Sequence, residues 1–163
     1  MRSEVDDLLS EQKTIVGIGV WSGGHRVNEQ RMALTLAIED TTTNLDFIIK
    51  AFPNEQDLKF TILLNFSRCI WRLCYSDNTG HVNNLNRPVH LPPGPFNSPH
   101  FHSWEDNRHI NTSGGLPRNL LYANFLPPDL TGFADCFLWF CEQTRIRVGK
   151  NQTPILPPAD RLL

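Results

Sequence analysis

Apolar segments with strand character follow one another between residues 14 and 75, and no helical pattern separates them. Residues 14–21, 31–40 and 45–52 each indicate a strand, and apolar side chains alternate with small or polar ones in 31–40. Residues 58–75 are too long for one ordinary strand, so we expect two strands or one strand bent near residues 65–67. Strands without helices between them favour antiparallel pairing, because a parallel connection needs a long crossover.

A proline-rich segment and a helical stripe follow these strands. Residues 86–99, NRPVHLPPGPFNSP, contain five prolines in fourteen residues, which excludes a helix interior or a central strand and predicts a semi-rigid surface connection. Near the N-terminus, residues 4–12 predict a short helix. A later apolar stripe has helical spacing and predicts a C-terminal helix; it consists of Phe133, Cys136, Phe137, Phe140 and Cys141.

Together these segments predict an α+β fold in a single domain, residues 1–163. We expect a mainly antiparallel sheet, a short N-terminal helix and a long C-terminal amphipathic helix packed on one face. In this scheme residues 1–85 form the helix and sheet, and residues 86–128 form a Pro/His-rich loop region with an H-x-H motif. Residues 129–147 form the C-terminal helix, and residues 148–163 form a tail.

Composition excludes some classes of protein. The chain has 163 residues, no apolar run approaches the roughly 20 residues that span a bilayer, and the N-terminus lacks an apolar signal-peptide core, so we expect a cytoplasmic protein without a membrane partner. A net charge of −2 is far from the basic footprint of a general nucleic-acid binder, although a local groove could escape this count. Cys69 and Cys74, like Cys136 and Cys141, are five residues apart, which predicts buried thiols and, on a strand, opposite faces.

Five of the six histidines, His81, His90, His100, His102 and His109, lie within 29 residues. His100 and His102 are two positions apart, so on an extended segment both rings project from one face. Such a pair can divide acid and base roles, can bind one divalent metal ion as neutral ligands, or can simply hydrogen-bond backbone carbonyls. The sequence leaves all three interpretations open.

The acid–base interpretation suits cleavage of an RNA phosphodiester, which needs a base for the 2′-hydroxyl and an acid for the leaving oxygen. In this hypothesis His100 and His102 take those roles without a cofactor, Arg108 acts as the electrophile, and His109 or His90 assists. Arg87, His90 and Trp104 are the candidate binding residues. The alternative cofactor is a divalent transition metal held by His100, His102 and Asp106.

Three stretches, NRPVH, SPHFHSW and FLPPDLTGFADCFLWFC, resemble small prokaryotic proteins of the TumE toxin type. The resemblance implies a cytosolic prokaryotic or mobile-element protein, with a toxin of a toxin–antitoxin pair as its function and an antitoxin or host protein as partner. Gly94, His100, His102 and Asp106 also resemble the first cupin motif, which implies a metal-dependent enzyme. A non-enzymatic protein of a phage or plasmid system, which blocks a partner with its loops and sheet surface, is the other hypothesis.

Overall fold

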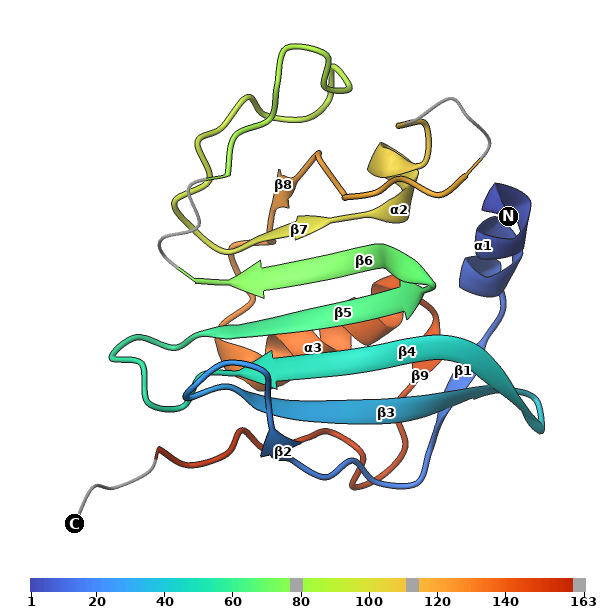
Figure 1. The fold of residues 1–163 in the computed structure, drawn as a ribbon, viewed down its shortest axis with the longest axis vertical. Coiled ribbons are helices and arrows are strands. Elements are labelled where there is room, and N and C mark those ends of the chain that lie inside the picture. The colour runs from blue at the N-terminus through green and yellow to red at the C-terminus, as the bar shows by residue number, and fades with distance from the viewer. Residues whose placement is uncertain (77–80, 111–114, 160–163) are drawn as a thin grey trace.

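The structure is a computed structural model, which describes residues 1–76, 81–110 and 115–159. Its helices and strands, in chain order, are α1 (Arg2–Ser10), β1 (Lys13–Val16), β2 (Ser22–Gly23), β3 (Gln30–Ile38), β4 (Thr41–Ala51), β5 (Phe60–Phe66), β6 (Arg68–Tyr75), β7 (His100–His102), α2 (Trp104–Asn107), β8 (Asn124–Phe125), α3 (Gly132–Gln143) and β9 (Ile146–Arg147). The strands form one sheet in the order β8-β7-β6-β5-β4-β3-β1-β9, with β2 paired to β3 (Figure 1). β1 and β9 are parallel, and the other pairs are antiparallel.

The predicted α+β fold with a long C-terminal amphipathic helix was wrong. The described part of the chain is mostly a nine-stranded mixed sheet, and its helices are short. The helix expected over residues 129–147 is the 12-residue α3, Gly132–Gln143. Arg145 has a left-handed backbone with φ of 55°, which ends a helix, and the next two residues pair with β1 as a strand. The prediction extended the helix to residue 147 because Arg145 and Arg147 suit the C-terminal end of the helix dipole.

Residues 58–75 form two strands, as predicted, and the reversal between them occurs at Ser67, where φ is 54°. A register shift follows, since Leu64 pairs with Trp71 but Asn65 pairs with Cys69. This β-bulge leaves Ile70 as the extra residue and changes the alternation of faces. Cys69 and Cys74 therefore lie on the same face of β6, and the prediction of opposite faces was wrong.

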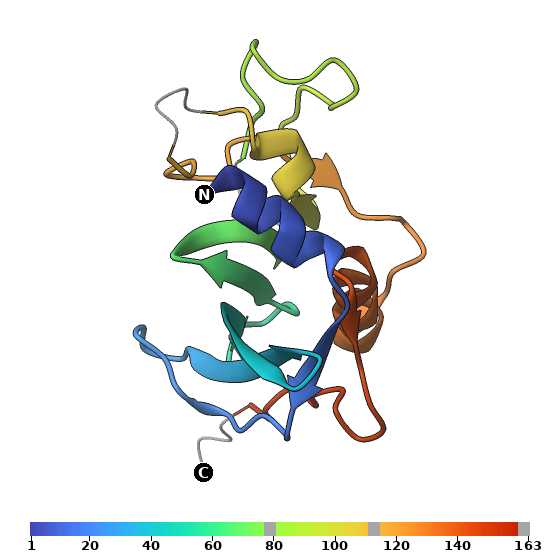
Figure 2. The ribbon, with the colours of Figure 1, turned by 90° about the vertical axis from the view of Figure 1, so that its right-hand side faces the viewer.

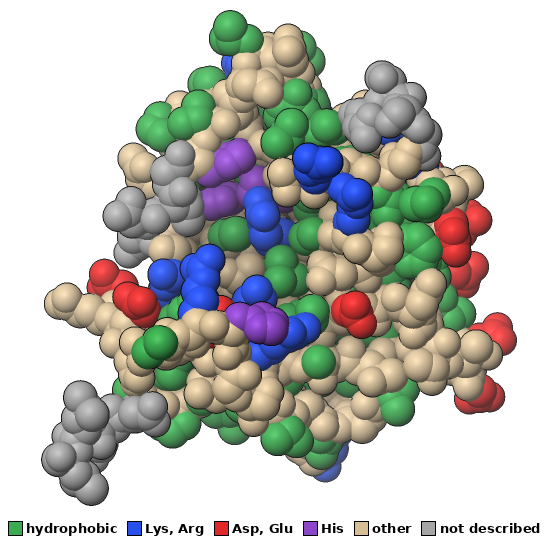
Figure 3. Space-filling model, viewed as in Figure 1, with side chains coloured by type: hydrophobic (Ala, Val, Ile, Leu, Met, Phe, Trp, Pro, Cys, Tyr) green, Lys and Arg blue, Asp and Glu red, His purple; other side chains and the backbone are tan. Residues whose placement is uncertain are grey.

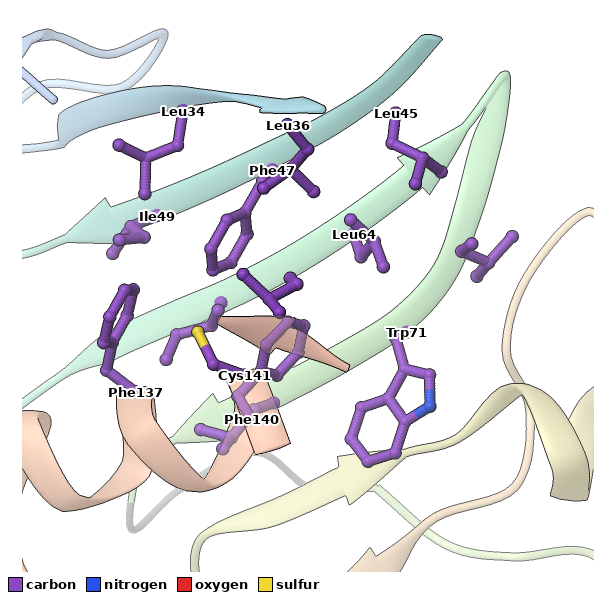
Figure 4. Close-up of a cluster of buried hydrophobic side chains, with 14 of the residues drawn as sticks. Leu34, Leu36, Leu45, Phe47, Ile49, Leu64, Trp71, Phe137, Phe140 and Cys141 are labelled. Carbon is purple, nitrogen blue, oxygen red and sulfur yellow. The ribbon is translucent and has the colours of Figure 1, made fainter. Parts of the chain in front are cut away.

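One face of the sheet packs against α3 and forms the core (Figure 4). The ring of Phe47 lies 5.8 Å from that of Phe137 and 5.6 Å from that of Phe140, and Phe140 also meets Trp71 edge-on at 5.4 Å. Such aromatic contacts bury large apolar areas, which is the main stabilising term for a sheet of this size. The core therefore lies between α3 and the strands β3 to β6.

The helix α3 lies behind the sheet in Figure 1, on one side of it (Figures 1 and 2). The face that is turned to the viewer carries polar and charged side chains (Figure 3). We call this surface the open face; among its residues are Arg31, Lys50, Thr61, Arg72 and Cys74, each of which alternates with core residues along its strand. The proline-rich segment connects β6 to β7 and projects beyond the sheet, as predicted (Figure 1). In the described residues, no helix combines the length and apolar character that a bilayer-crossing segment requires.

Candidate metal centre

Strand β7 carries His100 and His102 and aims both rings toward the side of the open face. Its middle residue, Phe101, points the other way, where its ring stacks on Trp71 at 5.2 Å. The strand ends at His102 because Ser103 caps the short helix α2, with Ser103 Oγ accepting from the backbone N–H of Asp106 at 3.2 Å. The ring centroids of His100 and His102 are 5.2 Å apart. The prediction that these two side chains share one face is confirmed.

Two further side chains complete a group that we call the His/Cys cluster: Cys74, His81, His100 and His102. Cys74 on β6 is the direct cross-strand partner of His100. One ligand atom from each of Cys74, His100 and His102 lies within 4.8 Å of the other two. His81 covers this trio, with its ring 4.8 Å from that of His102 and 5.7 Å from that of His100. The thiol and the imidazoles of His100 and His102 therefore converge beside the sheet, and the His81 ring packs against the two imidazoles.

Hydrogen bonds assign which ring nitrogens remain available. Nδ1 of His100 donates to the carbonyl of Ser98 at 3.1 Å, which leaves Nε2 as the free acceptor. Nε2 of His81 donates to Oδ1 of Asn83 at 3.3 Å, which leaves Nδ1 free. Nε2 of His102 accepts from Nη2 of Arg72 at 2.9 Å. Its Nδ1 is buried and has no hydrogen-bond partner among the described residues.

Burial keeps the central rings uncharged. His100 is 2% exposed and His102 is 0% exposed. Burial and the neighbouring Arg72 lower the pKa of His102 to about 2, and burial also lowers the pKa of His100. Burial likewise raises the pKa of the Cys74 thiol. Neutral imidazoles are the form that binds metal ions, whereas the acid of an acid–base pair must carry a proton near neutral pH.

The dimensions of the cluster suit a transition-metal ion after a small adjustment. Tetrahedral Zn²⁺, with bonds of about 2.1 Å to nitrogen and 2.3 Å to sulfur, needs donor atoms roughly 3.5 Å apart. The separation of up to 4.8 Å among Cys74, His100 and His102 must therefore shrink by about 1 Å. Fixed tautomers of the kind seen at His81 and His100 are typical of metal-ligating histidines.

Comparisons of the chain with protein-family models, with curated proteins and with solved structures found no match. The resemblance to TumE-type proteins stays a prediction.

The other predicted site residues do not join the His/Cys cluster. His90 and His109 line a separate surface pocket of about 490 Å³, together with Asp106 and Tyr122. Nε2 of His90 lies 2.7 Å from Oδ1 of Asp106, and Oδ2 of Asp106 accepts from Oγ of Ser103 at 2.8 Å. Both carboxylate oxygens of Asp106 therefore have partners at the start of α2. Asp106 is not a ligand beside His100 and His102, as the alternative metal site required.

Arg108 and Trp104 lie against helix α1 instead of beside the histidines. Nε1 of Trp104 donates to Oδ1 of Asp6 at 2.7 Å, and the Arg108 guanidinium pairs with both carboxylate oxygens of Asp6. Burial raises the pKa of Asp6, but these two donors outweigh burial and the net pKa is lowered. Trp104 is 1% exposed, and Nε of Arg87 donates to the carbonyl of Leu91 at 3.0 Å. These contacts give Arg108, Trp104 and Arg87 structural partners away from the cluster.

Sequence reasoning missed Cys74 and His81 of the cluster, and also Arg72, which donates a hydrogen bond to His102. Their positions depend on which strand lies beside β6 and on how the segment before β7 folds back. The residue spacing along the chain contains neither fact. The one available signal was the alternation of Arg72 and Cys74 along one strand, two positions apart, like His100 and His102 along another.

Proposed function

We propose that this is a transition-metal-binding protein, and that Cys74, His100 and His102 are its ligands with His81 in the fourth position. The observation that carries the proposal is the convergence of one thiol and two imidazoles within 4.8 Å of one another. Nitrogen and sulfur donors in this ratio favour Zn²⁺ among the common divalent ions. In a reducing cytosol, which we propose as the compartment, Cys74 stays a thiol that can lose its proton to the metal.

The proposed site has a structural role. Its ligands come from β6, β7 and the segment that connects them, so a bound ion ties the proline-rich connection to the edge of the sheet. Four protein ligands also leave no open coordination position, which is the usual arrangement of a structural zinc site. Metal binding then contributes directly to folding stability.

Elemental analysis tests this proposal. The purified protein is exposed to Zn²⁺, separated from free metal by gel filtration, and analysed for zinc per chain. We expect about one equivalent for the wild type and for His90→Ala, and a large loss for His100→Ala and His102→Ala. Equal zinc in the wild type and in these two variants would overturn the proposal.

Cleavage of RNA by His100 and His102 remains a second candidate, since Nη2 of Arg72 lies 2.9 Å from the His102 ring and supplies a cation. In this form of the hypothesis Arg72 replaces Arg108 as the electrophile. An RNA-cleavage assay on the metal-free wild type and on the double variant His100→Ala/His102→Ala decides it, because equal activity ends this mechanism. The interaction-protein hypothesis also stays a prediction. A stoichiometric complex with a partner that the same double variant preserves would favour it.

A further inference from the structure

The open face carries two cations directly opposite each other. Arg31 on β3 and Lys50 on β4 are cross-strand partners, and their sequence neighbours Met32 and Ile49 point into the core. Like charges at directly opposed positions destabilise an antiparallel sheet. Among the described residues, no carboxylate forms an ion pair with Arg31 or Lys50. The buried Glu29, two residues before Arg31, also has an Oε1 without a hydrogen-bond partner in the described residues, so neither cation is neutralised by a direct ion pair.

Buried donors on the same face lack partners as well. Nε of Arg31 and Nε of Arg72 are both buried, and neither has a hydrogen-bond partner in the part of the chain that the structure describes. Such orphaned donors are rare in folded proteins and are costly to leave unpaired. Because the two Nε atoms are shielded from solvent, a ligand with several anionic oxygens would pair with the terminal nitrogens of these guanidinium groups and with the Lys50 ammonium.

The cations extend across the sheet instead of gathering at one point. Arg31, Lys50 and Arg72 lie on β3, β4 and β6, so they span three strand spacings, roughly 14 Å. Figure 3 shows Lys and Arg side chains across the middle of this face. Asp46 is the acidic residue nearest to them along β4, roughly 13 Å from Lys50. This span exceeds a single phosphate and suits a polymer with repeated negative charge.

The burial of these side chains distinguishes a lipid surface from a flexible polymer as the anionic ligand. Arg31, Lys50 and Arg72 are all half-buried in the surface of the sheet. A flat lipid surface does not reach half-buried donors, whereas a narrow, flexible single strand can lie along them. We propose that the open face binds the phosphodiester backbone of a single-stranded nucleic acid without regard to base sequence. The net charge of −2 hides this local concentration of positive charge.

Fluorescence anisotropy tests the proposal with labelled 12-nucleotide oligouridine and oligothymidine over a range of salt concentrations. Binding of the wild type should weaken with salt, and log Kd against log salt should change by about 0.7 for each phosphate contacted. Arg31→Gln and Lys50→Gln should each weaken binding by about threefold to tenfold and lower this slope by about 0.7. Lys150→Gln, which removes an exposed cation outside the face, should leave both quantities unchanged.

Three results would overturn the proposal. They are no salt-dependent binding of either oligonucleotide, unchanged binding by the double variant Arg31→Gln/Lys50→Gln, or binding only to phosphatidylserine vesicles. Comparison of the two oligonucleotides distinguishes RNA from DNA as the source of the backbone. Cys74→Ser should still bind the oligonucleotide, since Arg31 and Lys50 lie outside the His/Cys cluster, so this test is independent of the proposed metal site. Circular dichroism of each variant confirms that it is folded.

Discussion

Nη2 of Arg72 lies 2.9 Å from Nε2 of His102, at the nitrogen lone pair that a metal ion would use. Because the ring is neutral and its Nε2 accepts from Arg72, the ring proton is on Nδ1 and Nε2 is the acceptor of this ring. The guanidinium and a metal ion therefore compete for one lone pair. Arg72 is half-buried, and its long side chain can turn away from His102 along the open face when the metal binds.

Arg72→Met should consequently raise zinc affinity. Loss of one charge-assisted hydrogen bond that the metal must break, together with removal of a neighbouring positive charge, should lower the Kd for Zn²⁺ by about tenfold or more. Competition with a chromophoric chelator measures the change. Arg68→Met on the same strand is the matched control, since Arg68 is exposed and makes no contact with the cluster. An unchanged or raised Kd in Arg72→Met would contradict the competition.

The buried histidines predict that the metal-free protein loses stability in mild acid. The pKa of His102 falls from 6.5 to about 2 on folding, so below pH 6.5 the unfolded chain takes up a proton that the folded chain does not. The neutral His102 therefore costs no free energy of unfolding above pH 6.5. Below pH 6.5 the free energy of unfolding decreases as the pH falls. His100 acts in the same direction. Between pH 7 and pH 5 we expect a loss of about 2 kcal/mol from His102.

Urea unfolding in the presence of a chelator measures this dependence. His102→Gln removes the titrating group and should have a shallower loss between pH 7 and pH 5 than the wild type, whatever its absolute stability. If the wild type has the same free energy of unfolding at pH 7 and at pH 5, His102 takes up its proton in the folded protein as readily as in the unfolded chain, which contradicts the prediction.

The opposed cations of the open face predict a stabilising substitution. Lys50→Thr removes one member of the Arg31–Lys50 pair and places a β-branched residue in a central strand, so the free energy of unfolding should rise by about 0.5 kcal/mol. The gain should shrink at high salt, where the repulsion is already screened. Chemical denaturation at low and high salt measures it. A destabilised variant at low salt would mean that Lys50 has a favourable partner.

The contact of Asp6 with Trp104 and Arg108 predicts a structural effect without an effect on metal binding. Asp6→Ala leaves the buried indole N–H without its acceptor and should cost about 1 to 3 kcal/mol of unfolding free energy. Its zinc content should equal that of the wild type. Glu4→Ala, on the exposed side of the same helix, is the control and should change stability little. A loss of bound zinc in Asp6→Ala would connect Arg108 to the cluster after all.

The strands were predictable where one physical pattern dominated. β3 alternates buried and exposed side chains from Met32 to Leu36, and a reversal or bend near Ser67 was expected because residues 58–75 exceed the length of one strand. The length of α3 was not predictable, because Arg145 carries no sequence signal for a left-handed backbone and basic residues such as Arg145 and Arg147 suit the end of a helix. The pairing of β9 with β1 joins residues more than a hundred positions apart. Local periodicity contains no information on such a contact.

The same division applies to the candidate site. His100 and His102 were predictable as a pair, because alternation along one strand decides which side chains share a face. Cys74 was predicted to lie on the face opposite Cys69, because a five-residue spacing ignores the β-bulge between them. The placement of Arg108 was also unpredictable, since its partner Asp6 is 102 positions away in the chain.

Absorption spectroscopy with Co²⁺ tests the central claim most directly, because cobalt substitutes for zinc and reports a thiolate ligand through a near-ultraviolet charge-transfer band. Titration of the chelator-treated wild type should give this band together with the visible bands of tetrahedral cobalt, with an end point near one equivalent. Cys74→Ser should lose the charge-transfer band, and Cys69→Ser, which alters the neighbouring thiol of the same face, should keep it. If the wild type gives no thiolate band, or if the band persists in Cys74→Ser, the His/Cys cluster is not a metal site.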